Sequence, residues 1–300
     1  MKDARLPALA VAFAAVMWGL WWIPVRWLGE RGLHGDWPSL ALFGVTAALL
    51  APLAIARRAR LKAGGADLIL SGVLFGVMMV LWNHAVLIGE VVRVVLLFYL
   101  APVWATLLAV TVLRESVGVW RFFSVALGLS GAVVVLGFEQ GWPLPRSTAD
   151  WLGLLSGLLF ALSATLARRA EAVSGFDKTI VSYIAAAAAA LLFVLLDTRP
   201  HPSGAEVFAA MPLALATSVL FILPATWLVF WGAARLDPGR VAILLLLELI
   251  AAALAAAVLT QEPFGLREAV GCTLILLAGL AEAVPDLRAA RRKPADGKAL

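Results

Sequence analysis

Glu248 is the residue in this sequence whose surroundings point most directly to chemistry. Four leucines precede it, Leu-Ile-Ala-Ala follows it, and no cation lies close to it in sequence. It comes eight residues after Arg240, which is about 12 Å along a helix that rises ~1.5 Å per residue. A charge at that depth of an apolar helix is costly. We therefore expect Glu248 to bind a proton or a substrate amine, or else to pair with a hydroxyl or amide of another helix.

Aromatic and polar side chains in other apolar stretches could complete such a site. Trp18 and Trp22 share a helix face at i, i+4, and His84 either binds substrate or a proton, or caps the end of its helix. Aromatic walls suit apolar amino-acid side chains and flat cations, the latter through cation–π attraction, although plain core packing is the alternative for each aromatic. The predicted substrate-binding residues are Trp18, Trp22, His84, Tyr99, Trp104, Ser163, Trp227 and Glu248, with Glu248 and His84 as candidates for proton coupling.

The sequence carries no pattern typical of an enzyme. It has only three histidines, His34, His84 and His201, and no GxSxG, HExxH or P-loop pattern. A catalytic site needs a nucleophile with its base, a metal-binding cluster or a cofactor motif. We therefore predict a protein without catalytic residues, metal or cofactor. Cys272 is the only cysteine, so no disulfide forms within the chain.

Composition places the chain in a membrane. Of its 300 residues, 63% are hydrophobic and only 14% are charged, with a mean hydropathy of +0.96. A spanning helix needs about 20 mainly apolar residues, and such stretches follow one another with short polar breaks. We predict an all-α integral membrane protein with ten transmembrane helices. Their ranges are about 7–28, 38–56, 67–88, 92–113, 118–138, 150–168, 179–196, 209–232, 240–260 and 266–285.

Basic residues predict the orientation of these helices. Loops on the cytoplasmic side of a membrane carry an excess of Lys and Arg. Alternate loops and the two ends hold 18 of the 24 Lys and Arg residues on one side. Both termini are therefore expected in the cytoplasm. The basic residues of the loop from Arg57 to Lys62 suit contact with anionic lipid, so the net charge of +5 does not indicate a nucleic-acid partner.

An internal repeat organises the chain. A shift of 147 positions places Arg93 on Arg240 and Glu115 on Glu262, each Glu at the end of an apolar stretch. A repeat of this size indicates two similar halves, and halves with five helices each must have opposite orientations, as in many transporters. The expected parts are a first repeat at 1–140, a linker at 141–147, a second repeat at 148–287 and a basic tail at 288–300. Residues expected to close helix ends, anchor them or gate the pathway are Pro102, Glu115, Glu262, Arg93 and Arg240.

Several short motifs in this plan resemble a known transporter family. They are Trp18-Gly19, Pro102, Leu113-Arg114-Glu115, Gly128-x-x-Gly131 and Glu262-Pro263. Together with the repeat, they resemble the EamA-type ten-helix branch of the drug/metabolite transporter superfamily, and the Trp-rich first half looks most like the YddG-type amino acid exporters.

The resemblance implies a bacterial inner-membrane secondary transporter that exports aromatic and other neutral amino acids from the cytoplasm by alternating access through a central cavity. The alternative is efflux of lipophilic or cationic drugs or of other metabolites. The expected partners are the lipid bilayer and a small-molecule substrate, without nucleic acid and without an obligate protein partner.

Overall fold

The structure is a computed structural model that describes residues 5–111, 118–137, 144–170, 172–236, 238–260, 262 and 264–292, and every regular element within them is a helix. The first half contains α1 (Arg5–Gly19), α2 (Trp22–Glu30), α3 (Trp37–Ala56), α4 (Arg58–Ala63), α5 (Gly65–Ile88), α6 (Val91–Phe98), α7 (Ala101–Thr111) and α8 (Val119–Leu136). The second half contains α9 (Thr148–Arg169), α10 (Gly175–Leu196), α11 (Gly204–Thr217), the π-helical turn η1 (Ser218–Ile222), α12 (Leu223–Ala233), α13 (Pro238–Leu245), α14 (Leu247–Leu259) and α15 (Leu266–Arg292).

Eight helical segments are long and apolar enough to cross a membrane within the described part of the chain. They include the joined pairs α1–α2 and α6–α7 and the run from α11 to α12. The apolar part of α8, Phe122–Leu136, is shorter. The prediction of an all-α membrane chain is therefore confirmed, while the count of ten spans stays a prediction.

Three of the predicted spans, 7–28, 92–113 and 240–260, coincide with candidate spans of the structure, but the helix is interrupted inside each of them. The first breaks between Gly19 and Trp22, the second at Tyr99 and Leu100, and the third at Leu246. Pro102 explains the second break, because its nitrogen has no hydrogen to donate to the carbonyl four residues earlier. A shift of 147 places Tyr99 on Leu246, so the two later breaks occur at equivalent positions of the repeat.

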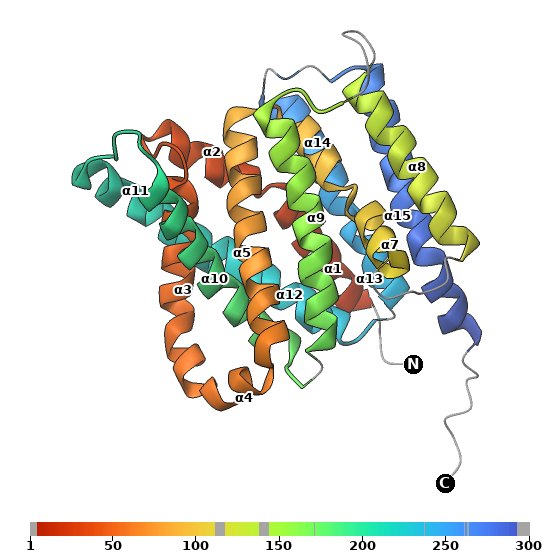
Figure 1. The fold of residues 1–300 in the computed structure, drawn as a ribbon, viewed down its shortest axis with the longest axis horizontal. Helices are drawn as coiled ribbons and strands as arrows, with labels where there is room; N and C mark the ends of the chain where they lie inside the picture. The colour runs from red at the N-terminus through yellow and green to blue at the C-terminus, as the bar shows by residue number, and fades with distance from the viewer. Residues whose placement is uncertain are drawn as a thin grey trace.

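Small residues set the closest helix contacts around α5. A Cβ added at Gly76 would lie 2.6 Å from the carbonyl carbon of Ala185 on α10, and one added at Gly72 would lie 2.8 Å from Val181. Glycines allow helix backbones to approach closely in a membrane, where packing rather than water exclusion drives association. In Figure 1, α5 lies beside α9, and α8 and α15 form a separate pair at one edge.

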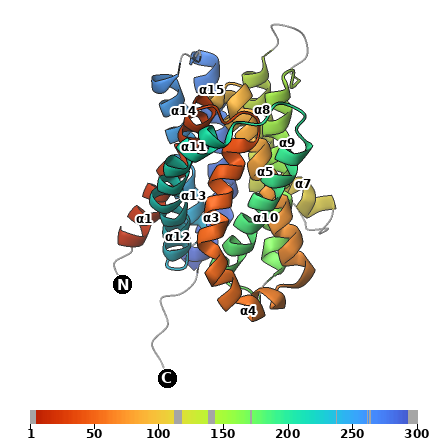
Figure 2. The ribbon, with the colours of Figure 1, turned by 90° about the vertical axis from the view of Figure 1, so that its left-hand side faces the viewer.

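One face of the bundle gathers basic residues. The start of α1 and the whole of α4, which carries Arg58, Arg60 and Lys62, lie toward the same face in both views (Figures 1 and 2). We call this the basic face. Helix α2 lies toward the opposite face (Figure 1).

Buried polar side chains are joined in pairs and chains between helices. The indole N–H of Trp21 donates to Asn83 Oδ1 at 2.9 Å, and Asn83 Nδ2 donates to Ser39 Oγ at 3.0 Å. Asn83 is fully buried. An unpaired amide there would be costly, so this chain fixes α5 against α3 and the α1–α2 break.

The packing at Gly76 gives a test of the fold. Gly76→Ala should lower the thermal unfolding midpoint of the detergent-purified protein, because overpacking of a tight contact costs roughly 1–3 kcal/mol. Gly204→Ala is the matched control, since no atom lies within 4 Å of a Cβ added there. Equal midpoints for the two variants would contradict the close contact between α5 and α10.

Candidate functional site

A cavity of about 420 Å³ lies among α1, α5, α9, α10, α12 and the junction of α13 and α14. This volume falls in the roughly 300–1,000 Å³ range of small-molecule sites. Its wall extends from Lys178, in the first turn of α10, to Trp82, near the far end of α5. Since α10 starts at the end of α9 next to the basic face, the cavity reaches from that side into the middle of the bundle.

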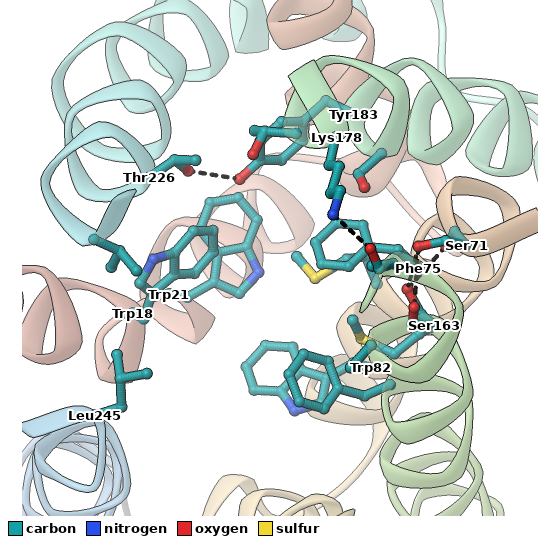
Figure 3. A pocket seen from close by; sticks show the side chains of 18 of the residues that line it. Trp18, Trp21, Ser71, Phe75, Trp82, Ser163, Lys178, Tyr183, Thr226 and Leu245 are labelled. Atoms are coloured by element: carbon teal, nitrogen blue, oxygen red, sulfur yellow. Dashed lines mark hydrogen bonds between the residues drawn. The ribbon is translucent and has the colours of Figure 1, made fainter. Parts of the chain in front are cut away.

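Aromatic side chains form much of the wall. Trp18 and Trp21, on the two sides of the α1–α2 break, lie with ring centroids 5.7 Å apart, and Figure 3 shows them across the cavity from Trp82 and Phe75. Phe75 meets Tyr183 edge to face at 6.1 Å. Such rings supply large apolar area and a negative face for a cation.

Glu248 lies in the wall at the start of α14, directly after the break at Leu246. Its carboxyl interacts with the side chain of Tyr99, the residue at the equivalent break in the first half. Among the described residues Glu248 forms no ion pair. The two breaks therefore meet at one point of the cavity and place one carboxyl group there.

Lys178 is a cavity residue that the sequence analysis did not select. The predicted span 179–196 begins one residue later and so places Lys178 in a loop. Its ammonium donates to the carbonyl oxygen of Ala167 at 2.5 Å, and Figure 3 shows it pointing toward the side of the cavity where Ser71 and Ser163 lie. The sequence does contain a pattern that predicts its position, because polar residues recur on one side of this helix. These residues all line the cavity: Lys178, Thr179, Ser182 and Tyr183.

Hydroxyl groups in the wall largely bond to one another. Ser163 Oγ donates to the carbonyl of Ser71 at 2.8 Å, and Ser71 Oγ donates to the carbonyl of Ser163 at 3.0 Å. Tyr183 and Thr226 share a hydrogen bond of 3.0 Å. These hydrogen bonds join α5 to α9 and α10 to α12.

Of the eight predicted binding residues, Trp18, Ser163 and Glu248 line the cavity, and Tyr99 touches it through Glu248. The other four lie elsewhere. Trp227 is 52% exposed and stacks on Trp231, because it lies on the outer side of α12. Trp22 is buried under the guanidinium of Arg26, 5.5 Å from its ring centre.

His84 and Trp104 are also outside the cavity wall. His84 Nδ1 lies 2.8 Å from the Asp36 carboxylate, so it joins α5 to the start of α3. The indole N–H of Trp104 is buried without a hydrogen-bond partner in the described structure. The sequence predicts His84 as an ionisable group and Trp104 as an aromatic group within apolar spans, but neither side chain lines the cavity.

Two of the five predicted structural residues, Glu262 and Arg93, form ion pairs at the face opposite the basic face. Arg26 pairs with Glu262 at 2.8 Å, and Glu262 also accepts from the backbone N–H of Val92 at 3.3 Å. The guanidinium of Arg93 donates two hydrogen bonds, of 2.6 and 2.9 Å, to the carboxylate of Asp150. Both ion pairs join the first half of the chain to the second.

The remaining structural candidates are less informative. Arg240 is exposed on α13, and the backbone of Pro102 lies at the start of α7. Glu115 lies outside the described residues.

At the basic face Arg57 pairs with Asp177 at 2.7 Å and stacks on Phe176, which joins α3 to the start of α10.

In the described ranges, no group of three or more His, Cys, Asp or Glu residues could hold a metal ion. Among the described residues, the cavity wall offers a ligand apolar and aromatic contact, the carboxyl group of Glu248 and the ammonium group of Lys178.

Comparisons with known proteins agree with this architecture. The model of the EamA-like transporter family matches residues 5–137 and again residues 147–281. No curated protein matches the chain. A solved structure described only as "Crystal structure of protein" is 19% identical, covers 96% of this chain and 98% of its own, and superposes with a TM-score of 0.57. At that identity the likeness shows a shared fold.

The Arg93–Asp150 pair gives a test of how the halves are joined. Asp150 is 2% exposed and Arg93 is 19% exposed, and removal of one partner of a buried pair costs roughly 3–5 kcal/mol. Asp150→Asn should therefore lower the unfolding midpoint in detergent clearly. The matched control is Asp67→Asn, in the exposed pair with Arg169, which should change it little. A similar small effect of both substitutions would show that the Arg93–Asp150 pair does not hold the halves together.

Proposed function

We propose, from its membership of the EamA-like transporter family, that the chain exports neutral amino acids with apolar or aromatic side chains. This is a duplicated, multi-pass membrane family of the drug/metabolite transporter type, and its members are transporters rather than enzymes. The observation that carries this proposal is the aromatic cavity with Glu248 in its wall. A carboxyl group without a cation can bind a substrate ammonium. The rings of Trp18, Phe75 and Trp82 can then enclose the side chain of the amino acid.

Alternating access is the mechanism that fits this proposal. The cavity reaches the basic face, while the Arg26–Glu262 and Arg93–Asp150 pairs hold the halves together at the opposite face. Basic residues favour the cytoplasmic side, so the proposed location is a bacterial inner membrane with both termini in the cytoplasm. In this orientation the cavity faces the cytoplasm, from which an exporter takes its substrate. Glu248 and His84 are the proposed proton-coupling residues.

Efflux of lipophilic cations is the second candidate function. A carboxyl group among aromatic rings also suits a flat cation. The substrate panel below separates the two functions.

Flux into proteoliposomes is the direct test of function. Labelled phenylalanine, tryptophan, methionine and threonine, and a lipophilic cation, should each be measured with and without an imposed pH gradient. We expect saturable flux of the apolar amino acids. A response of that flux to the gradient would reveal proton coupling. Rapid movement of the cation without any amino-acid flux would reject amino-acid export in favour of drug efflux.

Two substitutions in the cavity test the proposed site. Glu248→Gln removes the charge and Trp18→Ala removes part of the wall, and each should reduce phenylalanine flux at least about tenfold, equivalent to about 1.4 kcal/mol. The matched controls are Glu30→Gln and Trp151→Ala, since Glu30 is exposed and Trp151 is 55% exposed. Wild-type flux in either cavity variant, at equal amounts of folded protein, would remove that residue from the site.

A further inference from the structure

Lys178 is the feature of the cavity that an amine-binding site leaves unexplained. A cation in the wall would repel a cationic substrate, yet Lys178 lines the same cavity as Glu248. It is half-buried, and among the described residues it forms no ion pair. An ionisable side chain inside a membrane protein normally faces a partner or a pathway. The ammonium group of Lys178 is therefore available to an anionic ligand in the cavity.

The one hydrogen bond of Lys178 leaves most of its capacity unused. Its partner, the carbonyl of Ala167, is among the last carbonyls of α9, which ends at Arg169, and such carbonyls have no partner within their own helix. An ammonium group has three donors, so two remain after this bond. The Ala167 carbonyl is neutral and does not balance the charge. Two donors on a positive charge suit a carboxylate.

Several hydroxyl groups in the wall are already hydrogen-bonded, and none of them carries a charge. Ser71 and Ser163 bond each other's carbonyl oxygens, and Tyr183 bonds Thr226. Among the residues that the structure describes in the cavity wall, Lys178 alone is cationic. Any carboxylate that enters the cavity is thus best received at Lys178.

Lys178 and Glu248 do not neutralise each other. No ion pair within 4.0 Å joins them, and Glu248 interacts with Tyr99 instead. Resting on the function proposed above, we propose that Lys178 binds the carboxylate of the substrate while Glu248 binds its ammonium group. The site would then take zwitterionic amino acids with apolar side chains and would reject amines that lack a carboxylate.

A purely structural role for Lys178 makes a different prediction. If the lysine only caps the end of α9, its loss would lower stability and transport for every ligand alike. If it binds the carboxylate, its loss would change the preference between ligands that differ only in that group. The ratio of two ligands therefore separates the roles.

Competition against labelled phenylalanine in proteoliposomes measures that ratio. The unlabelled competitors are phenylalanine, phenethylamine, which lacks the carboxylate, and 3-phenylpropionate, which lacks the amine. In the wild type we expect phenylalanine to compete at least about tenfold better than phenethylamine. Lys178→Gln, which keeps a donor for Ala167 without the charge, should bring this ratio close to one. Lys178→Arg should retain the preference. Lys62→Met, at an exposed position of α4, is the matched control and should resemble the wild type.

An unchanged ratio in folded Lys178→Gln would overturn the proposal. If Lys178→Gln does not fold, Lys178→Met is measured in the same way with the same criterion. If the wild type transports no amino acid, the proposed function fails by itself. Binding of 3-phenylpropionate and phenethylamine to detergent-purified protein, followed by tryptophan fluorescence, then decides the role of Lys178. Loss of 3-phenylpropionate binding alone in Lys178→Gln would support a carboxylate site, and equal binding by wild type and variant would overturn it.

Discussion

A charge inside a membrane-spanning bundle must be paired, bonded or offered to a ligand, and this constraint accounts for most of the polar residues in this structure. Arg26 pairs with Glu262, Arg93 with Asp150 and Arg57 with Asp177, and these three pairs lie near the two faces of the bundle. Within the described chain, Glu248 and Lys178 face the cavity without such a partner. The paired charges near the faces hold the helices together. The unpaired charges of Glu248 and Lys178 in the cavity are the ones proposed to bind a substrate.

Close helix packing makes the charge pairs possible. Gly153 and Gly157 on α9 bring the backbone of α6 near, with added Cβ atoms 3.1 Å from Val94 O and 2.6 Å from Phe98 O. This contact places Arg93, on α6, against Asp150 in the first turn of α9. The same approach positions Tyr99, at the end of α6, near the centre of the bundle. The glycines of α9 thus determine where the Arg93–Asp150 pair joins the two halves. They also determine the position of Tyr99 in the bundle.

Much of the fold could be predicted from the sequence because apolar stretches of spanning length leave few alternatives. The all-α membrane chain and the duplication followed from composition and from the Arg93–Arg240 repeat. The breaks within three spans did not, since apolar stretches look alike whether the helix is continuous or interrupted. Only Pro102 signalled one of them in advance, through its missing backbone hydrogen.

The site was harder to predict than the fold, because it depends on helix rotation. Glu248, Trp18 and Ser163 were identified from type and depth alone, and they do line the cavity. Trp227 was chosen on the same grounds but lies on the outer side of α12. Lys178 was missed because a cation near a span end is normally assigned to the loop. Lys178 and Ser182 lie on the same face of α10, and both line the cavity. The polar face of a helix therefore predicts cavity residues better than depth in the membrane alone.

The repeat also explains why the cavity has one carboxyl group rather than two. Helices α6 and α13 occupy equivalent positions, and each ends at a break. The shift of 147 places Glu248 on Ala101 and Leu246 on Tyr99. The two halves therefore repeat the interrupted backbone, but the first half supplies a hydroxyl-bearing ring and the second a carboxyl group. Because these two side chains meet where the two interrupted helices approach each other, a repeated backbone produces a single site with different groups on its two sides.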